Sequence, residues 1–173
     1  MLMHIILHQT TLVLITHSEV RKMHVENIKV KGSLHIVLKD ALGNIKDERF
    51  LDNLVVDDGL AYIASRMKDA TATAMSHIAV GTSSTAAADA QTALVAETGT
   101  RASATVSLVQ TNVTGDSAQY VATFAAGNAT AVLTEAGVFN ASSAGTMLCR
   151  TVFGGIDKGA NDSLTITWKV VIA

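Results

Sequence analysis

The sequence predicts an all-β fold, an antiparallel β-sandwich or jelly-roll-like domain with one short helix. Apolar and polar residues alternate one by one in several segments, of which residues 28–38 and 163–172 are the clearest. Turn-forming residues separate these segments at intervals of about ten residues, as in sandwiches and barrels. The chain contains no proline, so Gly, Asn and Asp must form its turns.

Length and composition restrict the class of protein. At 173 residues the chain can bury one core without metal or disulfide support. A formal net charge of −2 gives no electrostatic footprint for nucleic acid or for an anionic membrane. The single cysteine, Cys149, excludes an intramolecular disulfide and fits a reducing compartment. Its strand context predicts a small buried side chain.

Residues 1–22 differ from the rest of the chain. Their apolar part is interrupted by His, Gln and Thr and follows no basic residue, which argues against a membrane-spanning helix and a signal peptide. The codons of Glu19 and Val20 can form a purine-rich ribosome-binding sequence, suitably spaced from a start at Met23. We therefore expect residues 1–22 to be a non-native or disordered extension and residues 23–173 to form a single β-sandwich domain. The alternative is a native N-terminal strand or interfacial arm.

The first elements predict a hairpin. Residues 28–38 form a half-buried strand, and residues 40–44 turn the chain into a second strand over residues 45–51. Four consecutive charged residues of that second strand would guard an exposed sheet edge: Lys46, Asp47, Glu48 and Arg49.

A helix and a loop follow the hairpin. Asp57 or Asp58 can cap a helix over residues 59–68. Its apolar face is predicted to hold Leu60, Ile63, Ala64 and Met67. Residues 76–81 form a short apolar strand, and the Ser/Thr/Ala stretch of residues 82–91 reads as an exposed loop, with a helical turn over residues 86–94 as the alternative.

The remaining elements are strands. Residues 101–109 and 117–125 are predicted to be joined by a turn over residues 112–116. Three further strands end the domain and bring the total to about eight short strands: residues 134–140, 145–153 and 163–170. In the last strand the alternation points Trp168 into the core, with its N–H reaching a partner. An exposed Trp168 that stacks on a sugar is the competing interpretation.

Candidate chemistry is sparse. The six histidines form no zinc-binding spacing, although His4 and His8 would share one face of a helix. Asp57 and Asp58 fit a helix cap better than a calcium site, and residues 157–162 fit a hairpin turn better than an oxygen-ligand loop. Nucleophile-elbow and phosphate-loop motifs are missing from the sequence. No catalytic, cofactor-binding or metal-binding residue is predicted.

Glu135 is a lone carboxylate in an apolar and Thr-rich stretch. It could be a general acid in a cleft, but no second carboxylate lies nearby in the sequence. A half-buried carboxylate needs partners, so we expect Glu135 to accept hydrogen bonds from backbone N–H groups or to pair with Arg101 or Arg150.

Several blocks of this sequence resemble small structural proteins of tailed bacteriophages. The blocks are residues 53–56 with Gly59 and Leu60, residues 77–82, residues 92–94 with Glu97 and Arg101, residues 134–140 and residues 147–151. The resemblance runs from about Lys29 to the C-terminus. It implies a non-enzymatic, β-rich homo-oligomer of the virion, of the head decoration or tail-fibre-associated type.

We therefore expect a capsid decoration or cement protein, or a tail or neck adaptor. It would form a dimer or trimer, bind other virion proteins such as major capsid or tail proteins, and occur in the virion and, during assembly, in the host cytoplasm. Hydrophobic residues make up 49% and charged residues 16% of the chain, which also favours surface buried between copies. Neither nucleic acid, nor membrane, nor a cofactor is predicted as a partner.

Two other functions remain open. A receptor- or glycan-binding tail-fibre module, with a host surface glycan as its partner, would carry exposed aromatics or a polar groove in the loops of residues 82–91 and 140–145. A hydrolase of cell-wall sugar would need two facing carboxylates in a cleft.

Overall fold

The computed structural model describes residues 29–68 and 73–172. The predicted extension, residues 1–22, lies outside these ranges, as do His4 and His8. The described elements are β1 (Val30–Lys39), β2 (Ile45–Val55), α1 (Asp57–Lys68), β3 (His77–Gly81), β4 (Glu97–Ser103), β5 (Thr105–Val109), β6 (Ser117–Phe124), β7 (Ala131–Phe139), β8 (Met147–Lys158) and β9 (Ser163–Ile172).

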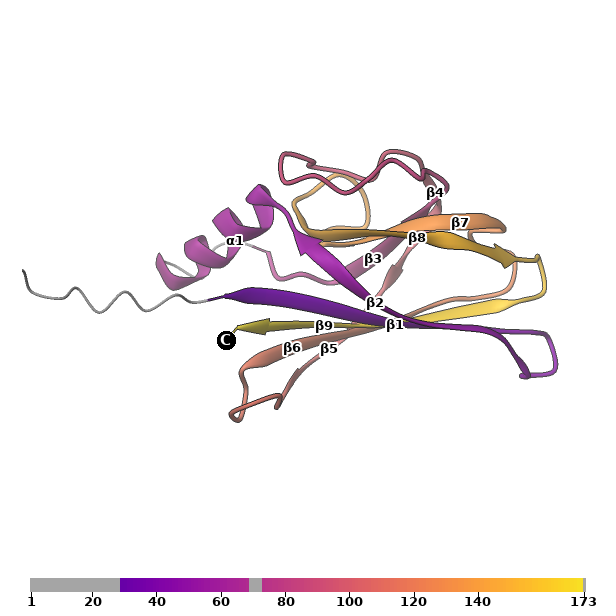
Figure 1. Ribbon diagram of the computed structural model, residues 1–173, viewed down its shortest axis with the longest axis horizontal. Coiled ribbons are helices and arrows are strands. Elements are labelled where there is room, and N and C mark those ends of the chain that lie inside the picture. Colours follow the sequence, from indigo (N-terminus) through magenta and orange to yellow (C-terminus); the bar gives the residue numbers. More distant parts are fainter. Residues whose placement is uncertain (1–28, 69–72, 173) are drawn as a thin grey trace, which may run out of the picture.

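The nine strands form one antiparallel sheet that folds over itself into a nearly closed, barrel-like sandwich. The strand order is β4-β3-β7-β8-β2-β1-β9-β6-β5. In Figure 1 the strands β4, β3, β7 and β8 form an upper layer, and β1, β9, β6 and β5 form a lower layer. The long strand β2 joins the two layers, since it pairs with β1 along most of its length and with β8 only at Leu54 and Val55. The predicted all-β sandwich with one short helix is confirmed.

Alternation fills the space between the two layers. Along β9 the residues Leu164, Ile166 and Trp168 are buried, while the residues between them face outward, as the sequence predicts. Side chains from both layers meet in one cluster, which includes Ile36, Phe124, Leu133, Val138 and Ile156. Alternation therefore leaves the lower layer a polar outer face.

The charged start of β2 is a locally free edge. Residues 45–53 pair with β1, and β8 joins β2 only after them. Arg49 Nε and Nη2 donate to the two carboxylate oxygens of Asp47 at 2.6 and 2.8 Å on the inner side of this edge. The predicted edge exposure of the charged residues Lys46, Asp47, Glu48 and Arg49 is thus correct only locally, because β2 as a whole lies between β1 and β8 in the sheet.

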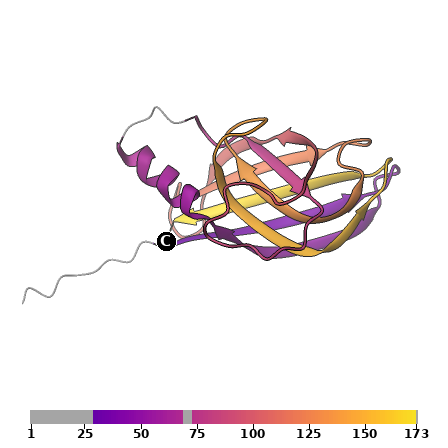
Figure 2. The same cartoon turned by 90° about the horizontal axis from the view of Figure 1, so that it is seen from above.

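The helix lies at the end of the sandwich at which β9 ends (Figure 2). It begins at Asp57, two residues earlier than predicted, and its first hydrogen bond runs from the Leu60 N–H to the Val56 carbonyl at 3.0 Å. The capping position is therefore Val56, while Asp57 and Asp58 lie in the first turn, where their charges favour the positive end of the helix dipole. Within the described residues, no helix is long and apolar enough to span a membrane.

The predicted apolar face of the helix is correct at Ile63 but wrong at Leu60, Ala64 and Met67, which are exposed. Met67 is 81% exposed and Leu60 is 48% exposed, whereas Tyr62 and Ile63 pack against the core. Gly59 sets this orientation, because a Cβ at this position would overlap the carbonyl oxygen of Leu148. The helix therefore packs the face that holds Gly59 against β8. The spacing of apolar residues alone had predicted an adjacent face of the helix.

The predicted strand over residues 101–109 is two strands. The chain leaves β4 of the upper layer at Ser103 and enters β5 of the lower layer at Thr105. At the crossing, the Ala104 N–H donates to the Ser76 carbonyl at 2.8 Å. Apolar alternation continues through the crossing, so the pattern gave no sign of the break. The sequence therefore predicts about eight strands, whereas the described residues form nine.

Aspartates hold the tight turns through backbone hydrogen bonds. In the turn between β5 and β6, Asp116 accepts hydrogen bonds from the backbone N–H groups of Thr111, Asn112 and Val113 at 2.6 to 3.0 Å. These bonds lower the pKa of the Asp116 carboxyl, and the bond from the Val113 N–H contributes most to that shift. In the turn between β8 and β9, a hydrogen bond from Lys46 lowers the pKa of Asp162.

Acid is expected to destabilise the fold. A carboxyl whose pKa is lower in the folded than in the unfolded state binds fewer protons when folded, so its stabilisation is full above the unfolded value of 3.8 and is lost as the pH falls through the folded value. We expect the melting temperature to be nearly constant from pH 7 to pH 5 and to fall below about pH 4. In the Asp116→Asn variant the melting temperature should fall less steeply below pH 4. An equally steep fall would contradict the role of Asp116 in the acid sensitivity.

Candidate functional site

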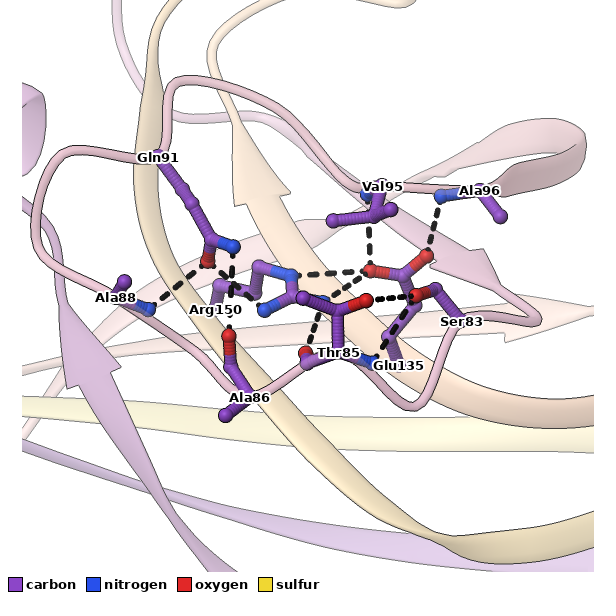
Figure 3. Close-up of polar contacts among 9 residues, drawn as sticks. All are labelled: Ser83, Thr85, Ala86, Ala88, Gln91, Val95, Ala96, Glu135 and Arg150. Atoms are coloured by element: carbon purple, nitrogen blue, oxygen red, sulfur yellow. Dashed lines mark hydrogen bonds and ion pairs between the residues drawn. The ribbon is translucent and has the colours of Figure 1, made fainter.

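A long loop covers the outer face of the upper layer. Residues 82–96, between β3 and β4, run across β7 and β8 (Figures 1 and 3). The loop is mostly exposed and contains no helix, so the loop prediction is confirmed and the alternative helical turn is wrong. Leu94 is its buried anchor and joins a second small core with Val56, Ala79, Phe139 and Met147.

Arg150 of β8 holds this loop from below. Its side chain is fully buried, and its guanidinium donates four hydrogen bonds to three residues (Figure 3). Nε and Nη2 donate to Oε2 of Glu135 at 3.0 and 2.7 Å, so both groups share one carboxylate oxygen. Nη1 donates to Oε1 of Gln91 at 2.8 Å, and Nη2 also donates to the carbonyl oxygen of Thr85 at 2.9 Å. One cation therefore ties two points of the loop to the sheet.

Glu135 of β7 completes the network from the other side. Its side chain is also fully buried. Oε2 accepts from the Val95 N–H at 3.1 Å and Oε1 accepts from the Ala96 N–H at 2.7 Å (Figure 3). The predicted pairing of Glu135 with Arg150 and with backbone N–H groups is confirmed. Its carboxylate connects two strands to the end of the loop, which makes it an anchor of the covering loop.

Arg101 fixes the second loop on this face, residues 140–146, by hydrogen bonds. It pairs with Glu97 through two hydrogen bonds of 2.8 and 2.9 Å, so it is not the partner of Glu135. Its Nη1 donates to the carbonyl oxygens of Ala141 and Ala144, and its guanidinium lies 3.6 Å from the centre of the Phe139 ring. The loop of residues 140–146 is thereby fixed by an arginine, as the loop of residues 82–96 is.

A buried lysine joins the turns at the opposite end of the sandwich. Lys158 is fully buried, and its Nζ donates to the carbonyl oxygens of Asp162 at 2.8 Å and Ala125 at 3.1 Å. Burial lowers its pKa. The carboxylate of Asp162 accepts from Lys46 Nζ at 2.5 Å and from the Gly159 N–H at 2.9 Å. Residues 157–162 are thus a hairpin turn, as predicted, with Asp162 paired to a lysine.

Two other predicted residues lie in the core. Trp168 is fully buried and its Nε1–H donates to Oδ1 of Asn53 at 3.0 Å, which confirms the predicted orientation and rules out sugar stacking on this ring. Cys149 is buried, and burial raises the pKa of its thiol, which keeps it protonated. Among residues 29–68 and 73–172, no group of three or more His, Cys, Asp or Glu is placed to hold a metal ion.

An open groove of about 380 Å³ lies on the outer face of the lower layer. We call it the outer-face groove. Its lining side chains come from four neighbouring strands: Ser33 and His35 of β1, Phe50 and Asp52 of β2, Gln119 of β6, and Thr167 and Lys169 of β9. The volume lies in the range of small-ligand sites.

Strand register explains why these residues meet. Asp52 pairs with Ser33, Ser33 with Lys169, and Lys169 with Gln119, which forms one polar row across four strands. Phe50 pairs with His35, and His35 with Thr167, in the neighbouring row. Residues two apart on a strand share a face, so the two rows lie side by side on the outer face.

An aromatic pair forms one wall of the outer-face groove. The rings of His35 and Phe50 are stacked, with centroids 4.3 Å apart and an angle of 3° between the planes. His35 Nε2 lies 2.7 Å from Oε1 of Glu48, which fixes the imidazole. Phe50 is nevertheless 75% exposed, which is unusual for a phenylalanine in the middle of a sheet.

The sequence did not predict this groove. A binding module was expected to carry exposed aromatics or a polar groove in the loops of residues 82–91 and 140–145, but those segments contain no aromatic residue and are fixed by arginines. The available signal was alternation, since Phe50 shares the outward positions of β2 with Glu48 and Asp52. The pairing of four strands could not be deduced from one sequence.

The fold and its surfaces define an all-β antiparallel sandwich with an open groove on one sheet face. Comparison of the chain with protein-family models, with curated protein sequences and with solved structures found no match.

Proposed function

We propose that this chain is a non-enzymatic structural protein of a tailed-bacteriophage virion, a homo-oligomeric capsid decoration or cement protein or a tail or neck adaptor. The sequence blocks described above support the virion assignment. The main structural support for self-assembly is an unguarded sheet edge at β5. An alternative function, binding of a receptor or glycan, is favoured by the outer-face groove.

Strand β5 has the features of an edge made for pairing. In the described part of the chain it pairs with β6 alone. Four of its five residues are exposed, with Leu108 at 74% and Val106 at 47%. Residues 105–115 contain neither a charged residue nor proline. Sheet edges of monomeric proteins are normally protected by charges, proline or bulges.

The other edges of the sandwich are protected in this way. The free part of β2 carries Asp47 and Arg49, and β4 carries Glu97 and Arg101 together with a register shift against β3. The contrast with β5 argues that this one edge is kept open for a partner.

The sequence of β5 is complementary to itself. In an antiparallel pair of two copies centred on Ser107, Val106 of one copy faces Leu108 of the other, and Thr105 faces Val109. Such a pair is isologous, the arrangement found in most homodimers. Two apolar cross-strand pairs would form, and both backbone edges would gain hydrogen bonds. A two-fold dimer through β5 is therefore the assembly that this edge fits.

Lysines in β5 are expected to dissociate the dimer. In the double variant Val106→Lys and Leu108→Lys, ammonium groups would face one another across the two-fold axis, where like charges repel. Light scattering after size exclusion should show a dimer for the wild-type chain and a monomer for this variant, with both proteins folded. Leu42→Lys is the matched control, because Leu42 is 87% exposed in a distant turn, and it should remain dimeric. A monomeric wild type, or a dimer that survives both lysines, would refute pairing through β5.

The virion assignment has its own test. Particles purified on a density gradient from a host that produces the phage should contain this protein in many copies, detectable by quantitative mass spectrometry. Absence of the protein from intact particles would overturn the assignment, whatever the oligomeric state. Its place in the head, neck or tail would follow from electron microscopy of particles labelled with antibodies against it.

A further inference from the structure

We infer that the outer-face groove binds a neutral oligosaccharide. The inference rests on the side chains of the lower layer and not on the virion assignment. It commits to one class of ligand because the groove combines an exposed aromatic wall with a row of polar side chains and no excess of positive charge.

The aromatic wall suits the apolar face of a sugar ring. The C–H groups on one face of a pyranose carry partial positive charge, and they pack favourably on the negative face of an aromatic ring. Phe50 is 75% exposed, so most of its ring can be reached from solvent. The Phe50 ring stacks on His35, and His35 is held by Glu48. These contacts restrict the Phe50 side chain before binding and so reduce the conformational entropy that it loses when a ligand binds.

The polar row suits sugar hydroxyl groups. Asp52 supplies a carboxylate acceptor, Lys169 an ammonium donor, Gln119 an amide that can donate and accept, and Ser33 a hydroxyl. Each hydroxyl of a saccharide is both a donor and an acceptor, so alternating donors and acceptors along one line can satisfy it from two sides. A few placed polar groups beside an apolar wall are typical of small-ligand sites.

The charges of the groove favour a neutral ligand. Asp52 and Lys169 offset one another, and Glu48 lies behind His35. Uronic acids, sialic acids and sulfated sugars would approach the carboxylates of Asp52 and Glu48. Lys169 is the one lysine of the groove lining that could offset this repulsion. An anionic saccharide therefore gains less here than a neutral one.

The length of the row implies more than a single sugar. The row from Asp52 to Gln119 crosses three gaps between adjacent strands, roughly 14 Å at the usual strand spacing. The aromatic wall stands at the β2 end of the groove, and the amide of Gln119 stands at the β6 end. An oligosaccharide lying across the strands can contact both ends, with one ring against Phe50 and its neighbours over Ser33 and Lys169.

Binding can be measured with the full chain on a glycan array that holds neutral and anionic oligosaccharides, followed by titration calorimetry with the best neutral glycan. We expect binding to neutral glycans, and Phe50→Ala should weaken it at least about tenfold, since aromatic anchors dominate such contacts. Gln119→Ala should weaken it too, while Phe50→Tyr, which keeps the ring, should stay within about threefold. Leu42→Ala is the control for loss of an exposed apolar side chain and should bind as the wild type does.

Three results would overturn the inference: no neutral glycan bound above background, binding confined to anionic glycans, or affinity unchanged by both Phe50→Ala and Gln119→Ala. Unfolding is not a concern for the aromatic variant, because the Phe50 side chain is mostly outside the core, and a thermal melt of each variant verifies this.

Discussion

Replacing Arg150 by methionine is expected to destabilise the folded state by about 3–5 kcal/mol, because removal of one partner leaves a buried charge uncompensated. Glu135 would keep only the N–H groups of Val95 and Ala96, in a site where both side chains are fully buried. The Thr85 carbonyl would lose the Arg150 donor, and Oε1 of Gln91 would keep only the Ala88 N–H. The midpoint of urea unfolding measured by circular dichroism reports this loss.

A double variant separates the uncompensated charge from the lost contacts. Glu135→Gln in the Arg150→Met background removes the buried charge but keeps an oxygen that can accept from the Ala96 N–H, while the Val95 N–H loses its acceptor. The double variant should therefore be more stable than Arg150→Met alone, by about 1–2 kcal/mol. Equal or lower stability would show that the charge is not the main cost.

The same pair should control the covering loop. Arg150 and Glu135 supply most of the bonds that join residues 82–96 to the sheet, while Leu94 is the buried apolar anchor of the loop. Segments with few buried contacts open locally at low free energy. Hydrogen exchange in the Arg150→Met variant should thus increase first at the Thr85, Ala88 and Gln91 amides, where the loop loses its bonds to Arg150, before the strands of the lower layer are affected.

The parts of the fold that depend on alternation could be predicted from the sequence. Leu164, Ile166 and Trp168 face the core as expected, because one buried face forces a period of two. The break at Ala104 and the packed face of α1 could not be predicted, because both depend on contacts distant in the chain: the Ser76 carbonyl in one case and the Leu148 carbonyl in the other.

Of the two polar sites, one could be predicted from the sequence and the other could not. Glu135 was recognisable as an anchor because a carboxylate among apolar residues must find partners, and Arg150 was among the candidates. The outer-face groove was not recognisable, because it arises from the order β2-β1-β9-β6, in which β9 from the end of the chain inserts between β1 and β6. A single sequence contains the alternation of each strand but not the order of its neighbours.

The proposed dimer and the groove are geometrically compatible. Edge-to-edge pairing through β5 places the two-fold axis perpendicular to the lower layer, so the outer faces of both copies point in the same direction. Both grooves would then meet one glycan-bearing surface at once. Two weak sites joined in this way gain effective affinity without any new contact, provided that the surface lets both engage.

Replacing Trp168 by alanine is expected to cost about 3–5 kcal/mol, the range for truncating a buried large aromatic side chain. Trp168 lies in the middle of β9, pairs with Leu34 of β1 and Tyr120 of β6, and is fully buried. Packing alone does not account for the whole loss, because Asn53 Oδ1 accepts from the indole and would be left without this donor. Thermal and urea unfolding of the variant measure the total.

The Asn53 contribution can be isolated with a phenylalanine at position 168. Trp168→Phe keeps most of the ring but removes the N–H, and the Asn53 amide nitrogen is already buried with no partner among the described residues. A buried amide without partners is costly, whereas removing both members of a hydrogen bond is nearly neutral. Adding Asn53→Leu to Trp168→Phe should therefore restore about 1 kcal/mol, although Asn53→Leu in the wild-type chain should destabilise it. Additive losses in the double variant would mean that the Trp168–Asn53 bond contributes no coupling, and that volume alone determines the role of Trp168.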